Sequence, residues 1–162
     1  MPACDPPSFC EELPTSGRLL GIDYGTVRIG LAICDESQRW VTPLDTYHRM
    51  DPKHDERFFS ELISREHVRG IVIGLPIHSD GRESQKSQEV RQFQVWLASL
   101  SEVPSLFQDE RFTTAEAQRL MKAAGLKHAQ RKKRVDRLAA HLILEHFLES
   151  RSNRSQHLTP LE

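Results

Sequence analysis

The stretch RLLGIDYGTVRIGLAICD, residues 18–35, decides the fold of this chain. It contains two short apolar runs, residues 18–24 and 28–34, which are separated by a turn that begins at Gly25. Short apolar runs bounded by turn residues are typical of β-strands, and so short a connection joins antiparallel neighbours. We therefore expect the folded domain to begin with a β-hairpin.

The remaining sequence extends this hairpin into a larger sheet. A weaker third strand, residues 39–46, is interrupted by Pro43 and completes an antiparallel meander. Beyond it, helical periodicity alternates with short apolar runs, which is typical of parallel strands joined by helices. The expected helices are 51–68, 84–100, 113–124 and 130–149, and the expected strands are 70–75 and 103–108. The order βββ-α-β-α-β-α-α predicts an α/β fold with a mixed five-stranded sheet and helices on both faces.

The composition is typical of a soluble globular protein. The 162 residues have a formal net charge of −1 and a mean hydropathy of −0.53. No run approaches the ~20 apolar residues that span a bilayer, and the start of the chain lacks the basic residues of a signal peptide. The cysteines (Cys4, Cys10 and Cys34) have neither disulfide-framework nor zinc spacing, which favours the cytoplasm. We expect one domain over 18–150, a disordered extension over 1–17 and a flexible tail over 151–162.

One segment is much more basic than the rest of the chain. Residues 111–137 contain nine Lys or Arg and only two acids, Glu116 and Asp136, so their formal net charge is +7. Most charge runs of this kind are solvated helix faces. A surface that contacts the phosphates of a nucleic acid is the alternative, and charge alone does not decide between the two.

Asp23 lies at the carboxyl end of the first expected strand. Side chains alternate along a strand, so Asp23 shares a face with Leu19 and Gly21. Ligands of open α/β sheets bind at the carboxyl ends of strands. An Asp before a glycine is also an ordinary turn residue, and Asp23 alone does not establish a site.

Two further acids, Asp109 and Glu110, close the last expected strand. Glu110 continues the strand face of Leu106 and Gln108, whereas Asp109 points to the other face. The simpler interpretation is that both are solvated acids before a helix, where the helix dipole favours negative charge.

Asp136 is more difficult to explain structurally. On a wheel of 100° per residue it falls within the apolar arc of the last expected helix. The apolar members of that arc are Val135, Ala139, Ala140, Leu142, Ile143, Leu144 and Phe147. A carboxylate facing the sheet needs a cation, a hydrogen-bond donor or a metal, and a structural ion pair is the alternative to a functional site.

Asp23, Glu110 and Asp136 come from distant segments and would meet at one edge of the sheet. An oxygen-only cluster suits one or two Mg²⁺ or Mn²⁺ ions, which activate a water and stabilise the leaving oxygen of a phosphodiester. These acids are therefore the candidate metal ligands and catalytic residues. Neighbouring glycine, hydroxyl and cationic residues are the candidates for substrate binding: Gly25, Thr26, Arg28, Ser79, Arg82, Arg111, Lys132, Lys133 and Arg134.

Four motifs together resemble those of the YqgF/RuvX family. They are GIDYGTVRIGLAICD (21–35), GLPIHSDG (74–81), DERFTTAEA (109–117) and RVDRLAAHLILEHFLE (134–149). They occur in the family's order, and the resemblance covers about residues 18–150. Phe112, where the family more often has Leu, and the acidic, proline-bearing extension depart from the pattern.

The resemblance implies an RNase H-like fold and a divalent-metal nuclease that matures the 5′ end of pre-16S ribosomal RNA during ribosome biogenesis. Family members were earlier proposed as Holliday junction resolvases. By motif, Asp23 matches the first-strand acid, Glu110 the acid of the DER segment, and Asp136 the acid of the last helix. The implied partner is pre-rRNA, with branched DNA as the alternative, together with an association with ribosome assembly and none with membranes.

Two functions of other classes stay open. Actin-like and sugar-kinase ATPases share such a sheet and place a similar Asp-x-Gly-Thr loop on nucleotide phosphates, but they use two domains of this kind. The second is a nucleic-acid-binding module on the same fold, in which the acids are structural and binding needs no metal.

Overall fold

A mixed β-sheet forms the centre of the molecule in a computed structural model, which describes residues 12–76, 84–110 and 128–157 and isolated positions between 119 and 125. The side chains of 128–136 and 154–157 lie outside this description. The strands are β1 (Arg18–Asp23), β2 (Arg28–Cys34), β3 (Val41–Pro43), β4 (Tyr47–His48), β5 (Val68–Leu75) and β6 (Ser105–Asp109). The order is β3-β2-β1-β5-β6, and β4 also pairs with β2. The predicted mixed sheet is confirmed.

The antiparallel part of the sheet is formed by the first strands. β1 pairs antiparallel with β2, and β2 pairs antiparallel with both β3 and β4. The predicted third strand is thus two short strands instead of one. Proline has no N–H to continue the ladder, and β3 ends at Pro43. β4 then pairs with the beginning of β2, through Arg28 and Ile29.

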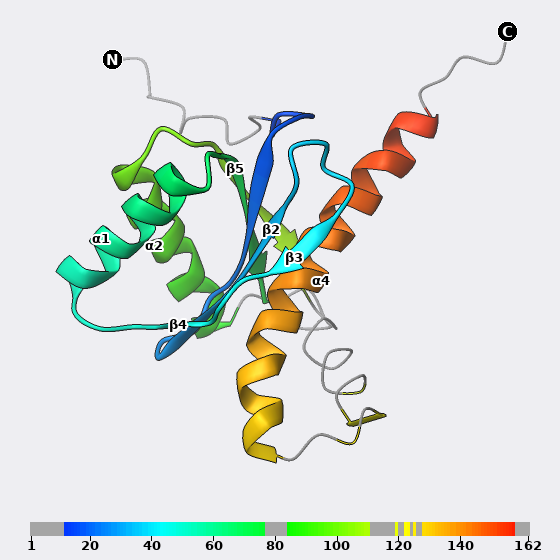
Figure 1. Ribbon diagram of the computed structural model, residues 1–162. Helices are drawn as coiled ribbons and strands as arrows, with labels where there is room; N and C mark the ends of the chain where they lie inside the picture. Colours follow the sequence, from blue (N-terminus) through cyan, green and yellow to red (C-terminus); the bar gives the residue numbers. More distant parts are fainter. Residues whose placement is uncertain are drawn as a thin grey trace, which may run out of the picture.

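Helices cover both faces of the sheet, as predicted. Helices α1 (Pro52–Arg65) and α2 (Gln85–Leu100) lie on one face, and α4 (His128–His157) crosses the other (Figure 1). Both α1 and α2 begin at a side-chain cap. Asp51 accepts a hydrogen bond from the backbone N–H of His54, and Ser84 accepts one from that of Ser87. The helix expected over 113–124 lies largely outside the described residues, although Gly125 has the positive φ of 71° expected of a helix-ending glycine.

Alternating residues of the strands divide the core into two clusters. Ile22 and Ile73 belong to the larger cluster, under α1 and α2, whereas Leu19 and Val72 belong to the smaller cluster, under α4. A strand presents successive side chains to opposite faces, so β1 and β5 are buried on both sides. The same alternation places Asp23 on the α4 face, together with Leu19 and Gly21.

Gly21 allows α4 to approach the sheet closely. A Cβ atom at this position would lie 2.9 Å from the carbonyl oxygen of Ala140 and 2.9 Å from Cβ of Leu144. Real Cβ atoms essentially never approach other atoms so closely. The backbone of α4 therefore rests on β1 at a point where no side chain separates them.

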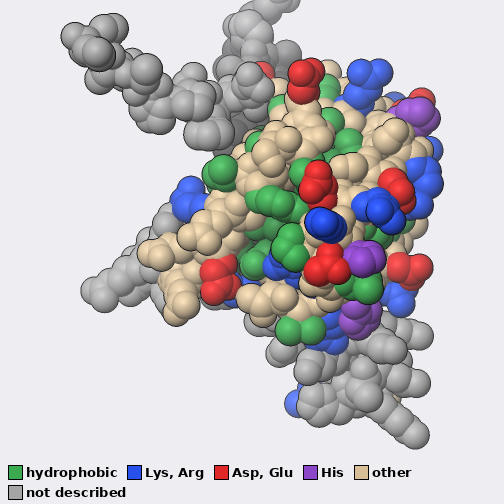
Figure 2. Space-filling view, turned by 90° about the vertical axis from the view of Figure 1, so that its left-hand side faces the viewer, with side chains coloured by type: hydrophobic (Ala, Val, Ile, Leu, Met, Phe, Trp, Pro, Cys, Tyr) green, Lys and Arg blue, Asp and Glu red, His purple; other side chains and the backbone are tan. Residues whose placement is uncertain are grey.

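The outer face of α1 and α2 has no single sign of charge. Acidic, basic and histidine side chains are intermixed there beside a group of hydrophobic side chains (Figure 2). Beneath it, Asp55 is 2% exposed and accepts hydrogen bonds from the Tyr47 hydroxyl (2.7 Å), Nε of Arg49 (3.1 Å) and the backbone N–H of Met50 (3.1 Å). Asp55 thus ties the first turn of α1 to the β4 segment. No helix in the described ranges is long and apolar enough to span a bilayer.

Both ends of the described chain differ from the sequence expectation. The chain is helical as far as His157, where a flexible tail was expected from 151. Leu13, which was expected within a disordered extension, is 2% exposed and belongs to the smaller core cluster. Arg151 explains both differences, because its guanidinium donates to the carbonyl of Leu13, to that of Pro14 (3.0 Å) and to Oε1 of Gln38 (2.9 Å).

Candidate functional site

Three strands end at the same edge of the sheet. β1, β5 and β6 run parallel, with Ile22 opposite Ile73 and Leu75 opposite Asp109. Asp23 is the last residue of β1, and Glu110 directly follows β6. The topology therefore places Asp23 and Glu110 together at the carboxyl edge of the sheet.

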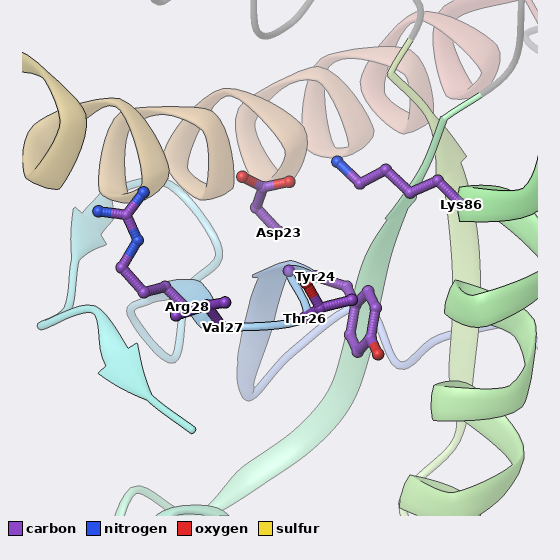
Figure 3. A pocket seen from close by; sticks show the side chains of 7 residues that line it. Asp23, Tyr24, Thr26, Val27, Arg28 and Lys86 are labelled. Carbon is purple, nitrogen blue, oxygen red and sulfur yellow. The ribbon is translucent and has the colours of Figure 1, made fainter. Parts of the chain in front are cut away.

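Asp23 lines a pocket of about 200 Å³ at this edge, together with Tyr24, Gly25, Thr26, Val27, Arg28 and Lys86. Its carboxylate points toward α4 (Figure 3). In Figure 3, Lys86 extends from α2 toward the carboxylate of Asp23, whereas Arg28, from β2, extends toward α4 on the other side of Asp23. One carboxylate between two cations is an arrangement that suits an anionic ligand, a metal, or both.

The predicted turn after β1 shapes this pocket. A Cβ atom at Gly25 would lie 2.2 Å from the carbonyl oxygen of Arg28, so only glycine fits there. The tight turn brings Gly25, Thr26 and Arg28 to the wall of the Asp23 pocket. These three predicted binding residues are therefore placed together with Asp23, although nothing in the structure tests what they bind.

Glu110 is a buried acid beside Asp23. It is 7% exposed and packs over Gly74, where a Cβ atom would lie 2.8 Å from Oε2 of Glu110. Its backbone N–H donates to the carbonyl of Leu75 at 3.2 Å. Asp109 is exposed, whereas Glu110 is buried, so the two acids lie on different faces as strand alternation predicts.

The electrostatic environment of Glu110 is unusual for a carboxylate. Burial, followed by the negative charge of Asp23, raises the pKa of Glu110 to about 8, against the opposing effect of Lys86. Within the described part of the chain, Oε2 of Glu110 is buried and accepts no hydrogen bond. A buried oxygen with no donor is costly, and a bound cation would compensate for it.

The position of Asp136 is described only through its backbone. Asp136 lies in α4 four residues before Ala140, which contacts β1 at Gly21. Residues four apart share a helix stripe, so position 136 is on the stripe of α4 that faces the sheet. Its side chain lies outside the described set, as do those of Lys132, Lys133 and Arg134. Ser79, Arg82 and Arg111 also lie outside the described residues.

The described side chains of the candidate site provide some of the ligands that a hard divalent cation needs. Asp23 and Glu110 offer oxygen ligands, which Mg²⁺ and Mn²⁺ prefer. The orphaned Oε2 of Glu110 is the observation that favours a cation. Among the described side chains, no three Asp, Glu, His or Cys residues lie close enough together to hold a metal ion. A third ligand would therefore come from a side chain outside the described set.

Sequence reasoning missed Tyr24, Val27 and Lys86 among the pocket residues, and Lys86 is the charged one of the three. It is the second residue of α2, and the first turn of this helix contains no acidic residue. A cation is disfavoured at a helix N-terminus, and that placement was the available signal. The signal is weak by itself, because many exposed lysines occupy such positions.

Known structures share this fold at low sequence identity. RuvC of T. thermophilus in complex with a Holliday junction substrate superposes with a TM-score of 0.52 at 17% identity, covering 83% of this chain and 95% of that chain. The fowlpox virus Holliday junction resolvase also has a TM-score of 0.52, at 12% identity, and the match covers 83% of this chain and 99% of the other. The sheet with its flanking helices is therefore of the RNase H-like class.

Sequence comparison defines the family. The RuvX family, described as "Holliday junction resolvase", matches residues 17–150. A Rhodopirellula baltica protein named "Putative pre-16S rRNA nuclease" is 42% identical over 140 residues, 86% of this chain and 81% of its own length. A Paramagnetospirillum magneticum protein of the same name is 36% identical over 152 residues, 94% of this chain and 98% of its own length. The chain belongs to the RuvX family.

Proposed function

We propose that this protein is a metal-dependent nuclease that hydrolyses phosphodiester bonds in pre-16S ribosomal RNA at its 5′ end. The observation that supports this most directly is Oε2 of Glu110, a buried oxygen with no described donor beside Asp23. Family membership supports the reaction class, and the names of the relatives support the RNA substrate. Such a substrate supports a cytoplasmic location and an association with ribosome assembly as parts of this proposal.

In this proposal Asp23, Glu110 and Asp136 hold one or two Mg²⁺ or Mn²⁺ ions. The ions would supply the activated water and would stabilise the leaving oxygen. The contribution of the protein is to fix the ligands. Asp23 is held by the end of β1, Glu110 by packing over Gly74, and position 136 by the contact of α4 with Gly21.

Substrate binding is assigned to the residues around these acids. Gly25, Thr26 and Arg28 line the pocket of Asp23, where an exposed backbone and a guanidinium suit phosphate oxygens. Ser79, Arg82, Arg111, Lys132, Lys133 and Arg134 complete the proposed binding residues, on sequence grounds alone.

Resolution of Holliday junctions is the second candidate, because the matching family is described by that activity. Cleavage of labelled pre-16S RNA and of four-way DNA junctions, each with Mn²⁺ or with EDTA, separates the two. We expect Mn²⁺-dependent cutting of the RNA. Preferential cutting of the junction would replace the first function by the second.

The site assignment is tested with Asp23→Asn and Asp136→Asn in the same assays. Both variants should lose cleavage, since an amide is a poor ligand for these ions. Asp109→Asn is the matched control, because Asp109 is exposed on the opposite strand face and should be dispensable. Undiminished cleavage by Asp23→Asn would refute the metal site, and binding without cutting by the wild type would favour the binding module.

A further inference from the structure

The position of Lys86 in its helix does not favour a lysine. Lys86 is exposed, and it lies in the first turn of α2, two residues after the cap residue Ser84. The positive end of the helix dipole disfavours a cation there by a few tenths of a kcal/mol or more. The charge of Lys86 acts on the carboxyls of the pocket itself, where it opposes the rise in the pKa of the buried Glu110.

The placement of Lys86 instead concentrates positive charge at the candidate site. Its side chain extends into the pocket of Asp23 from the side opposite Arg28 (Figure 3). Lys86 is also close enough to Glu110 to act on that carboxyl electrostatically. The N-terminus of α2 adds its own partial positive charge on the same side of the pocket.

We propose that Lys86 binds a phosphate of the substrate nucleic acid and holds it next to Asp23. An ammonium on a flexible stem suits a phosphate that approaches an open pocket, because it needs no fixed hydrogen-bonding plane. With Arg28 on the other side, the backbone of the nucleic acid would lie between two cations above the acids. This inference rests on the proposed function, because it assumes a nucleic-acid substrate at this site.

Lys53 provides a matched control within the same chain. It is also an exposed lysine and the second residue of its helix, α1, and it follows the cap residue Asp51 by two positions. It does not line the pocket of Asp23. Lys53→Met therefore removes the same charge from the same helical position, away from the candidate site.

The experiment measures binding of labelled pre-16S RNA and of a four-way DNA junction in EDTA, over a series of salt concentrations. Each phosphate contact contributes about 0.9 to the slope of log K against log salt on duplexes and about 0.7 on single strands. Lys86→Met should reduce the slope by about that amount and weaken binding by about five- to tenfold near 0.1 M salt. Lys86→Arg keeps the charge and should have the wild-type slope, and Lys53→Met should also have the wild-type slope.

An unchanged slope and affinity for Lys86→Met, with a wild-type thermal midpoint, would overturn the inference. An equal loss of slope and affinity for Lys53→Met would also overturn it. The effect would then come from the net charge of the protein and not from a contact in the pocket. The measurement does not depend on cutting. If the wild type binds but never cleaves, the nuclease function fails while the phosphate contact of Lys86 is still established by its slope.

Discussion

The carboxyl group of Glu110 lies directly over the backbone of Gly74. A Cβ atom at residue 74 would meet Oε2 of Glu110 at 2.8 Å and Cδ1 of Ile143, in α4, at 2.5 Å. At residue 74, β5 therefore contacts both the buried carboxyl of Glu110 and the helix α4. Glycine at this position allows the acid and the helix to reach the sheet together.

Gly74→Ala should therefore impair both stability and cleavage. Overpacking of a core position costs about 1–3 kcal/mol of unfolding free energy. The two contacts can be separated with Gly74→Ala/Ile143→Val, which removes the clashing Cδ1 atom. Urea unfolding should show partial recovery in the double variant, whereas cleavage should stay low because the clash with Glu110 remains. Full recovery of cleavage would show that the position of Glu110 does not depend on Gly74.

Glu110 should make the metal-free protein less stable as pH rises. Its folded pKa of about 8, raised by burial and then by Asp23, exceeds the ordinary value of 4.5. Between these values the folded state binds more protons than the unfolded state, so stability falls with increasing pH across that window. In EDTA, Glu110→Gln should match the wild type near pH 4 and exceed it above pH 8 by a few kcal/mol. Chemical unfolding at both pH values checks this, and parallel pH profiles would contradict it.

Asp55 should have the opposite pH dependence. Burial would raise its pKa, but hydrogen bonds from Met50 N–H, Tyr47 and Arg49 outweigh burial, so the pKa is lowered. The stabilisation that Asp55 gives to the folded state is complete above the ordinary pKa of an aspartate, and it is lost as pH falls through the lower pKa of Asp55 in the folded state. Asp55→Asn should cost about 1.5–3 kcal/mol at pH 7 and progressively less below pH 4, measured by urea unfolding.

The control for Asp55 is Asp51→Asn. Asp51 is exposed and caps α1, and asparagine caps helices as well as aspartate does. This variant should stay within about 0.5 kcal/mol of the wild type at neutral pH. A similar loss in both variants would mean that an exposed carboxylate at the start of α1 contributes as much as Asp55 does, and that the buried hydrogen bonds of Asp55 add nothing.

Arg151 should stabilise both ends of the described chain. Its guanidinium bonds to the Leu13 and Pro14 carbonyls and to Gln38, and lysine cannot reproduce that planar set of donors. Arg151→Lys should lose about 1–3 kcal/mol in urea unfolding. Hydrogen exchange should also become faster at 12–17 and in the last turns of α4. Faster exchange in only one of these segments would contradict the role of Arg151 in holding both.

The sequence predicted much of the fold because periodicity and alternation are local. Asp23 and Glu110 could be placed at one edge, and on one face, because parallel strands align their carboxyl ends and side chains alternate. Lys86 could not be found in this way, since its entry into the pocket depends on the packing of α2 against the sheet. Leu13 and Arg151 were missed because their contact joins residues 138 positions apart, and no local pattern carries that information.

The approach of α4 to Gly21 has a consequence for the metal preference of the proposed site. Asp23 lies two residues beyond Gly21, and position 136 lies one helical turn before Ala140, which contacts it. The separation of these two positions is thus set by a residue that has no side chain. Mg²⁺ demands a near-ideal octahedron, whereas larger ions tolerate wider and more flexible coordination. In the proposed metal site, a single methyl group added at residue 21 would move the helix outward and favour the larger ion, although every proposed ligand would remain unchanged.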